Sequence, residues 1–298
     1  MTPAIRRLPL LFLFLGAAAS RSRGSDAGVA AELAKADALR DAHEAEAAKA
    51  VYAKILRIAP DNPEANCSYG LYAADEGDWR RALKCEAKAV AADPGNARYQ
   101  YGWGVANGKA ALKGVVFAKM AHARKCLAAF QRASELAPDN LQYRWSLMLY
   151  YEQAPAILGG NMDLAYAEAT AIKKLNVVSG REAFAQVYTR DRKYDLAFQE
   201  YEQLLQAAPD SYSDLYDLGQ LTLSAGRHLE QGLAALRRCL ALPPVRGGPT
   251  HAEVHWRIGG ILERQGRSDL ARAEYLEALK EEPQLQPARQ ALDRLGKA

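Results

Sequence analysis

The stretch GGILERQGRSDLARAEYLEALKEEP, residues 259–283, decides the fold of this chain. Small residues, one aromatic residue and a final proline stand at fixed offsets within it, namely Gly259, Gly266, Ala271, Tyr275, Ala278 and Pro283. Similar spacing recurs upstream, where Pro60 and Pro94 are 34 residues apart, and further copies end at Pro138 and Pro209. A period of about 34 residues indicates an array of helical repeats, each of which buries its apolar face only against its neighbours.

This pattern resembles the tetratricopeptide repeat family over residues 29–283. The resemblance implies an all-α fold, a right-handed α-solenoid of about seven repeats, each made of two antiparallel helices, A and B. Counting from the prolines predicts repeats that begin near Val29, Pro63, Ala97, Leu141, Val178, Tyr212 and Ala252. Proline ends a helix because it lacks an N–H and clashes with the preceding turn. We expect the Asp-Asn or Asp-Ser pairs that follow three of these prolines to cap the next helix.

Three segments depart from the plain repeat, and residues 284–298 are expected to form a capping helix with a polar outer face. Pro94 and Pro138 are 44 residues apart, which predicts about ten extra residues between the two helices of repeat three, within 107–125. Residues 154–160 form an insertion at the turn between the helices of repeat four. Residues 243–249 are rich in proline and glycine and predict a loop.

The N-terminus is typical of a secretory signal peptide. Arg6 and Arg7 precede an apolar run over residues 8–19, and small residues follow at 17–20. A bilayer span needs about 20 apolar residues, so this run is too short to be a membrane anchor. We therefore expect cleavage of residues 1–20, a short linker over 21–28, and a periplasmic or extracellular protein. Two alternatives remain open at this point: an uncleaved N-terminus weakly associated with a membrane, and a downstream start codon that would leave the protein cytosolic.

Composition is that of an ordinary soluble protein, and the motifs that would indicate an enzyme are incomplete. The chain is 49% hydrophobic and 25% charged, and its net charge of +4 is small for a dedicated nucleic-acid binder. His43-Glu44 begins like a zinc-protease motif, but Ala47 stands where the second histidine is needed. His251 and His255 share a helical face, yet no further ligand is adjacent, so we expect two solvated histidines. We therefore predict no catalytic residue, no metal and no cofactor.

The four cysteines, Cys67, Cys85, Cys126 and Cys239, are irregularly spaced and lie where helices are expected. A free cysteine behaves as a small apolar residue, so core packing is the main interpretation. The alternative is a disulfide between Cys67 and Cys85, which belong to the two antiparallel helices of one repeat.

The inner wall of such an array is made of A helices and is the expected binding surface. The fifth position of the repeat, which faces this wall in the family, is aromatic in four repeats, and amides and an arginine flank it. The expected partner-binding residues are Arg98, Tyr101, Gln142, Trp145, Gln186, Tyr216, Gln220 and Trp256. Aromatic anchors beside hydrogen-bonding groups suit a protein or peptide partner, although the same rings could instead only fill the space between repeats. Cys67, Ser68 and Glu182 stand where some family members hold an acidic C-terminal tail, which disfavours that ligand.

A second candidate surface is basic. Residues 94–134 contain no acidic residue, and they include the basic patch Lys109, Lys113, Lys119, Arg124, Lys125 and Arg132. Apolar residues such as Leu112 and Met120 alternate with these lysines. The segment is either a docking surface for an anionic lipid or another acidic partner, or a solvated helix face.

Overall fold

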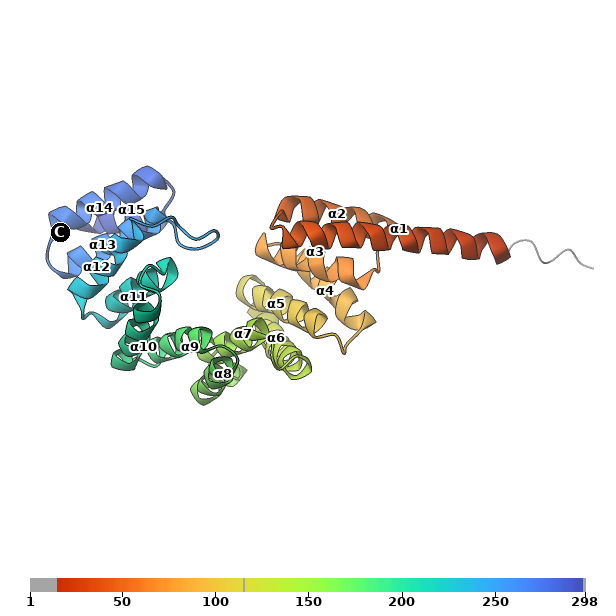
Figure 1. The fold of residues 1–298 in the computed structure, drawn as a ribbon, viewed down its shortest axis with the longest axis horizontal. Helices are drawn as coiled ribbons and strands as arrows, with labels where there is room; N and C mark the ends of the chain where they lie inside the picture. Colours follow the sequence, from red (N-terminus) through yellow and green to blue (C-terminus); the bar gives the residue numbers. More distant parts are fainter. Residues whose placement is uncertain (1–14, 115, 297–298) are drawn as a thin grey trace, which may run out of the picture. The chain divides into compact units, whose positions relative to one another are not determined.

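The protein is all-α, and its computed structural model describes residues 15–114 and 116–296 (Figure 1). Across these residues there are fifteen α-helices, one short 3₁₀ helix and no β-strand. The chain forms two compact units, residues 1–143 and 144–298, and the division between them falls inside α7. No helix of the described part is at once long and apolar enough to cross a bilayer.

The first unit is built from three helix pairs and the start of α7. α1 packs against α2, α3 against α4, and α5 against α6. Their bounds are α1 Leu15–Asp41, α2 Ala45–Ile58, α3 Pro63–Asp75, α4 Trp79–Ala92, α5 Ala97–Lys113 and α6 Val116–Leu136. α3 also contacts α5, so the first helices of successive pairs lie side by side.

The second unit continues this arrangement from α7 (Leu141–Gln153) onwards. α9 packs against α10, α11 against α12, and α13 against α14, while α8 contacts α9 of the next repeat and α15 packs on α14. The bounds are η1 Ala156–Leu158, α8 Met162–Leu175, α9 Val177–Arg190, α10 Tyr194–Ala207, α11 Tyr212–Ala225, α12 Leu229–Cys239, α13 His251–Arg264, α14 Ser268–Glu281 and α15 Gln286–Leu295.

Side-chain caps fix where the A helices begin, as expected from the residues that follow the prolines. Asn62 accepts a hydrogen bond from the Ala65 N–H at 2.9 Å, and Asn140 accepts one from the Tyr143 N–H at 3.2 Å. Thr250 and Glu253 form a reciprocal capping box at the start of α13. Such caps satisfy backbone donors that have no partner within the helix.

Close packing within a pair depends on a small residue facing a large one. A Cβ atom added at Gly259 on α13 would lie 2.4 Å from the ring of Tyr275 on α14, so only glycine lets the tyrosine pack against the α13 backbone. Tyr275 is buried there together with Leu233, Leu236, Ile258 and Ile261. The spacing between Gly259 and Tyr275 in the sequence therefore reflects the close packing of α13 on α14.

The expectation of extra residues between the helices of repeat three is wrong. The additional residues lengthen α5 to 17 residues and α6 to 21 residues, and only residues 114 and 115 separate the two helices. Residues 97–113 and 116–136 contain no proline, so nothing ends either helix early. The two helices form a hairpin longer than the neighbouring ones.

Residues 21–28, expected to form a short linker, are helical and continue α1. Residues 15–41 contain no proline and are rich in alanine, so the helix continues through them. The predicted signal peptide, residues 1–20, lies mostly outside the described residues, which begin at Leu15.

A single residue joins repeats four and five. The N–H of Asn176 donates to the Ile172 carbonyl at the end of α8, and the Asn176 side chain accepts a hydrogen bond from the Ser179 N–H of α9 at 2.9 Å. One asparagine thus serves both helix ends, where repeats one, two, three and five end in a proline followed by a short turn.

Candidate functional site

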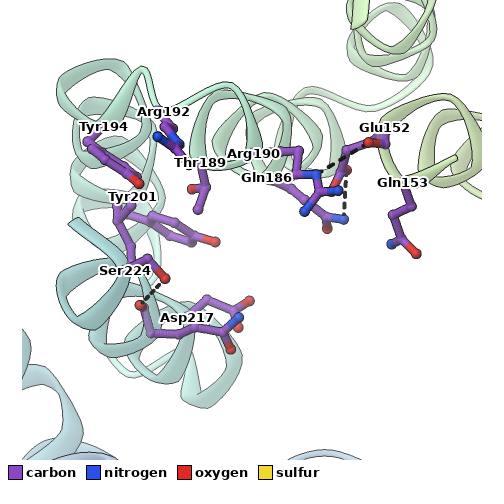
Figure 2. A pocket seen from close by; sticks show the side chains of 12 residues that line it. Glu152, Gln153, Gln186, Thr189, Arg190, Arg192, Tyr194, Tyr201, Asp217 and Ser224 are labelled. Atoms are coloured by element: carbon purple, nitrogen blue, oxygen red, sulfur yellow. Dashed lines mark hydrogen bonds between the residues drawn. The ribbon is translucent and has the colours of Figure 1, made fainter. Parts of the chain in front are cut away.

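The second unit contains a pocket with a cavity volume of about 490 Å³ (Figure 2). Its wall comes from α7, α9 and α11, which are successive A helices, and from α10 and the turn before it. The lining residues are Glu152, Gln153, Gln186, Thr189, Arg190, Arg192, Tyr194, Tyr201, Asp217, Gln220, Leu221 and Ser224. Most of these side chains are polar, so the pocket offers hydrogen bonds more than apolar contact.

The α7 side of the pocket is braced by hydrogen bonds. Gln186 Nε2 donates to Glu152 Oε2 at 3.0 Å, and Arg190 Nε donates to the Glu152 carbonyl oxygen at 3.3 Å (Figure 2). Burial raises the pKa of the Glu152 carboxyl, while the Gln186 amide and the Arg190 charge act to lower it. These bonds fix Gln186 and Arg190 in place before any ligand arrives.

The α11 side carries an unpaired carboxylate, that of Asp217. Within the described part of the chain it makes no hydrogen bond or ion pair, although it is half-buried. Burial, followed by the nearby charge of Asp214, raises the pKa of Asp217 to about 6. Arg257 opposes this rise, but its guanidinium donates to Gln220 Oε1 at 3.0 Å and lies over the ring of Tyr216 at 4.6 Å.

Tyr201 of α10 completes this side of the pocket. Its side chain is only 7% exposed, and Figure 2 shows its hydroxyl at the end of the ring that reaches into the pocket. The hydroxyl has no hydrogen-bond partner in residues 144–296. Burial, with the charges of Asp217, Asp214 and Glu182, raises the pKa of Tyr201 well above its ordinary value, so the hydroxyl is protonated at neutral pH.

Five of the predicted partner-binding residues belong to this unit; two of them line the pocket and three do not. Gln186 and Gln220 line it. Tyr216 is buried, and Trp256 is half-buried with the Arg257 guanidinium 4.9 Å from its ring. Trp145 is half-buried on α7 and does not line the pocket. In α9 and α11 the residues that line the pocket come later in the helix than the fifth position.

The sequence interpretation missed Glu152, Arg190, Tyr201 and Asp217. Three of them could have been found, because Glu152, Arg190 and Asp217 lie on A helices after the fifth position of their repeat. They therefore reach a neighbouring part of the same wall. Tyr201 belongs to the B helix α10, so a search confined to the A helices could not find it.

In the first unit, the predicted residues bind one another. The Arg98 guanidinium pairs with Glu64 and donates to Ser68 Oγ at 2.7 Å. The Tyr101 ring stacks on Tyr143, with centroids 4.9 Å apart, and Gln142 Nε2 donates to the Tyr101 hydroxyl at 3.2 Å. These contacts join successive A helices and make Tyr101 part of the packing between repeats.

The basic patch lies along the α5–α6 hairpin of the same unit. Lys109 and Lys113 are on α5, and Lys119, Arg124, Lys125 and Arg132 are on α6. Arg132 pairs with Glu135 at 3.1 Å, whereas the other five have no acidic side chain within ion-pair distance among the described residues. Near the end of the hairpin the apolar side chains Leu112 and Met120 are 75% and 44% exposed.

The structure supports core packing for the cysteines but does not support solvated histidines. All four cysteines are free and buried, so the Cys67–Cys85 disulfide is not formed; the Cys67 thiol instead points toward α5, 3.8 Å from the Arg98 carbonyl oxygen. The two histidines are half-buried rather than solvated, and His255 Nδ1 lies 2.6 Å from Glu274 Oε2. The described residues contain no group of three or more His, Cys, Asp or Glu side chains that could hold a metal ion.

Solved structures share this fold at low sequence identity. A tetratricopeptide repeat protein from Parabacteroides merdae is 15% identical, with a TM-score of 0.64 over 90% of this chain and 98% of its own. A TPR protein from Thermus thermophilus is 19% identical, with a TM-score of 0.51 over 71% of this chain and 99% of its own. A human IFIT1 dimer solved with m7Gppp-AAAA is 18% identical, with a TM-score of 0.63 over 85% of this chain and 58% of its own.

No curated protein sequence matches the chain significantly. A family model described as tetratricopeptide repeat matches residues 33–97 in the first unit and 216–286 in the second. Paired antiparallel helices, glycine-to-aromatic packing within the pairs and the shared fold of the solved structures agree with that match. Tetratricopeptide repeats are therefore present in both units of the chain, which has the fold of a tetratricopeptide repeat protein.

Proposed function

We propose that this chain is an exported, non-enzymatic scaffold that binds an extended segment of a partner protein in the pocket formed by α7, α9, α10 and α11. The observation that carries the proposal is the pocket itself, about 490 Å³ in volume and lined mainly by polar side chains, most of them from three successive A helices. Ligand pockets in proteins typically measure about 300–1,000 Å³. The tetratricopeptide fold supports a protein-interaction scaffold in general.

A peptide suits this wall better than a compact apolar ligand does. Gln153, Gln186 and Gln220 place side-chain amides along the pocket, and an amide both donates and accepts hydrogen bonds. A peptide backbone offers the complementary groups at every residue, so a short extended segment can satisfy several of them at once. Because the α7 side is already hydrogen-bonded, little side-chain ordering opposes binding.

The pocket assignment is tested by selecting displayed random peptides on the purified protein. We expect recurrent sequences whose affinity falls roughly fivefold or more in a Gln186→Ala, Gln220→Ala variant, since each lost hydrogen bond weakens binding. The matched control is Gln199→Ala, Gln206→Ala, which removes two exposed amides from α10 outside the pocket. The proposal would be contradicted if no recurrent peptide were selected, or if the pocket variant and the control variant bound the peptides with equal affinity.

Export is part of the same proposal and rests on Arg6, Arg7 and the apolar residues 8–19. The test is mass spectrometry of the N-terminus of protein taken from fractionated cells. A mature chain that starts near residue 20 and lies outside the cytoplasm supports export. An intact N-terminus on protein from the cytoplasm contradicts it.

A second candidate function is docking of the α5–α6 hairpin on an anionic membrane surface. Exposed Leu112 and Met120 beside unpaired lysines favour it, because apolar insertion and charge attraction act together at a lipid interface. Binding to phosphatidylglycerol vesicles, but not to phosphatidylcholine vesicles, should vanish in a Lys113→Glu, Lys119→Glu, Lys125→Glu variant. The control Lys84→Glu, Lys174→Glu, Arg237→Glu carries the same net charge on exposed sites elsewhere.

A further inference from the structure

We infer that the bound segment places a lysine or arginine side chain in the pocket, against the carboxylate of Asp217 and the hydroxyl of Tyr201. This inference deepens the proposed function and rests on it, because it names the chemistry of the partner at one end of the same pocket.

Three carboxylates from two helices act on one another at this end of the pocket. Asp214 and Asp217 are on α11, Glu182 is on α9, and the charges of Asp214 and Glu182 both raise the pKa of Asp217. Asp214 is only 5% exposed, and none of the three forms an ion pair with a residue of the described chain. Like charges held together in a partly buried place are unfavourable unless a cation joins them.

Arg257 of α13 is the cation of this chain that acts on Asp217, and it is already engaged. Its guanidinium donates to Gln220 and lies over Tyr216 and Trp256. One positive charge beside three carboxylates leaves this part of the molecule with an excess of negative charge. A cationic side chain from a partner would remove that excess.

The Tyr201 hydroxyl is a second, independent indication of a ligand. The Tyr201 side chain is only 7% exposed, and its hydroxyl reaches into the pocket without a hydrogen-bond partner in the second unit. A hydroxyl oxygen accepts hydrogen bonds, and lysine and arginine are donors without acceptors. Carboxylate and hydroxyl together therefore match a cationic donor and not an anionic acceptor.

The pocket also contains two arginines, which would repel a cationic ligand near them. Neither lies at the Asp217 end of the pocket, so they favour binding of the cation at that end. Arg190 belongs to the braced α7 side, where it bonds to the Glu152 carbonyl oxygen. Arg192 is exposed on the turn before α10 and is solvated. Neither is an ion-pair partner of Asp217, so the pocket has an acidic end at α11 and basic groups at the end of α9.

The test uses the peptides selected on the wild-type protein. We expect lysine or arginine to recur at one position, and affinity to fall on the order of tenfold or more in Asp217→Asn and a few-fold in Tyr201→Phe. The control Glu202→Gln removes an exposed carboxylate of α10 and should leave affinity within about twofold. Carbon-13 NMR of labelled aspartate should show the Asp217 pKa falling when a selected peptide binds.

The outcomes separate this inference from the proposed function. Peptides that bind in the pocket without an enriched basic position, or that bind Asp217→Asn as well as wild type, overturn the inference and leave the peptide-binding function standing. Enrichment of aspartate or glutamate overturns it in favour of recognition by Arg190 and Arg192. Absence of any selected peptide overturns both.

Discussion

The carboxyl group of Glu86 on α4 lies directly against Gly102 on α5. A Cβ atom at residue 102 would be 2.2 Å from Glu86 Oε2, and one at Gly70 on α3 would be 2.7 Å from Oε1. Glu86 is 0% exposed, and by geometry neither oxygen has a hydrogen-bond partner in the described structure. Tyr52 and Tyr275 fill the corresponding groove in other repeats, so an acid here occupies a place built for a large apolar side chain.

Replacing this acid by an apolar residue of similar size should stabilise the protein. Glu86→Leu removes a buried group without hydrogen bonds and should raise the free energy of unfolding by about 1–3 kcal/mol at pH 7. Urea denaturation measures the change. Glu86→Gln serves as the control, since it keeps a buried polar group but cannot ionise; a Leu variant that is less stable than wild type would contradict the prediction.

The same carboxyl should make stability depend on pH. Burial raises the pKa of Glu86 well above 4.5, and the Cys67 thiol only partly opposes this. The folded protein therefore holds this proton more tightly than the unfolded chain, so stability falls as pH rises from about 4.5 through the folded pKa. Thermal unfolding of wild type and Glu86→Gln between pH 4.5 and 8 should show the gap between them widening with pH, and parallel curves would refute the assignment.

A methyl group at residue 102 should destabilise the first unit. Gly102→Ala forces Glu86 to move and should cost about 1–3 kcal/mol, because the core there has no room. Gly28→Ala is the matched control, since nothing lies within 4 Å of its added Cβ and alanine favours a helix. Adding Glu86→Ala should recover part of the loss in a double-mutant cycle, and strictly additive effects would show that the two residues do not interact.

Truncating Tyr101 separates packing from recognition. Tyr101→Ala removes a ring stacked on Tyr143 and Phe130 and should lower stability by roughly 2–3 kcal/mol. It should leave the affinity of pocket-selected peptides unchanged, because the pocket belongs to the other unit. Weaker peptide binding by a folded Tyr101→Ala variant would show that Tyr101 takes part in binding, which would contradict the prediction.

His255 should titrate above its ordinary range. The hydrogen bond to Glu274 raises the pKa of His255 above 6.5, so this pair stabilises the fold below about pH 6.5 and the contribution is lost as pH rises through the folded pKa. Proton NMR of the imidazole measures this pKa directly. Glu274→Gln should bring it down, and an unchanged value would mean that Glu274 is not the cause.

The fold could be predicted from the sequence because its information is local. Proline ends a helix, a capping asparagine starts the next, and alanine or glycine at fixed spacing lets two helices approach; each of these acts within a few residues. Counting residues could not show whether the extra length of repeat three forms a loop or longer helices. That outcome depends on how α5 and α6 continue to pack on each other beyond the ordinary turn.

The site was predicted less well because side-chain partners come from neighbouring repeats. Arg98 and Tyr101 were expected to face a ligand, yet Glu64 and Tyr143, each about one repeat or more away in sequence, occupy them. The opposite holds for Asp217, which counts in a sequence as one more surface acid. Its interest comes from the absence of an ion-pair partner within the second unit, and such an absence is visible only once the neighbouring helices are in place.

The joint at Asn176 has a consequence for how the second unit unfolds. Since the end of α8 and the start of α9 share this one residue, fraying of either helix removes a hydrogen bond from the other. The two helices should therefore exchange their amide hydrogens as one cooperative block, even though they belong to different repeats. α12 and α13 share no such residue, because residues 240–250 form a longer connection between them, so we expect their ends to fray independently of each other. The unit of unfolding is then set by the joints between repeats and not by the repeats themselves.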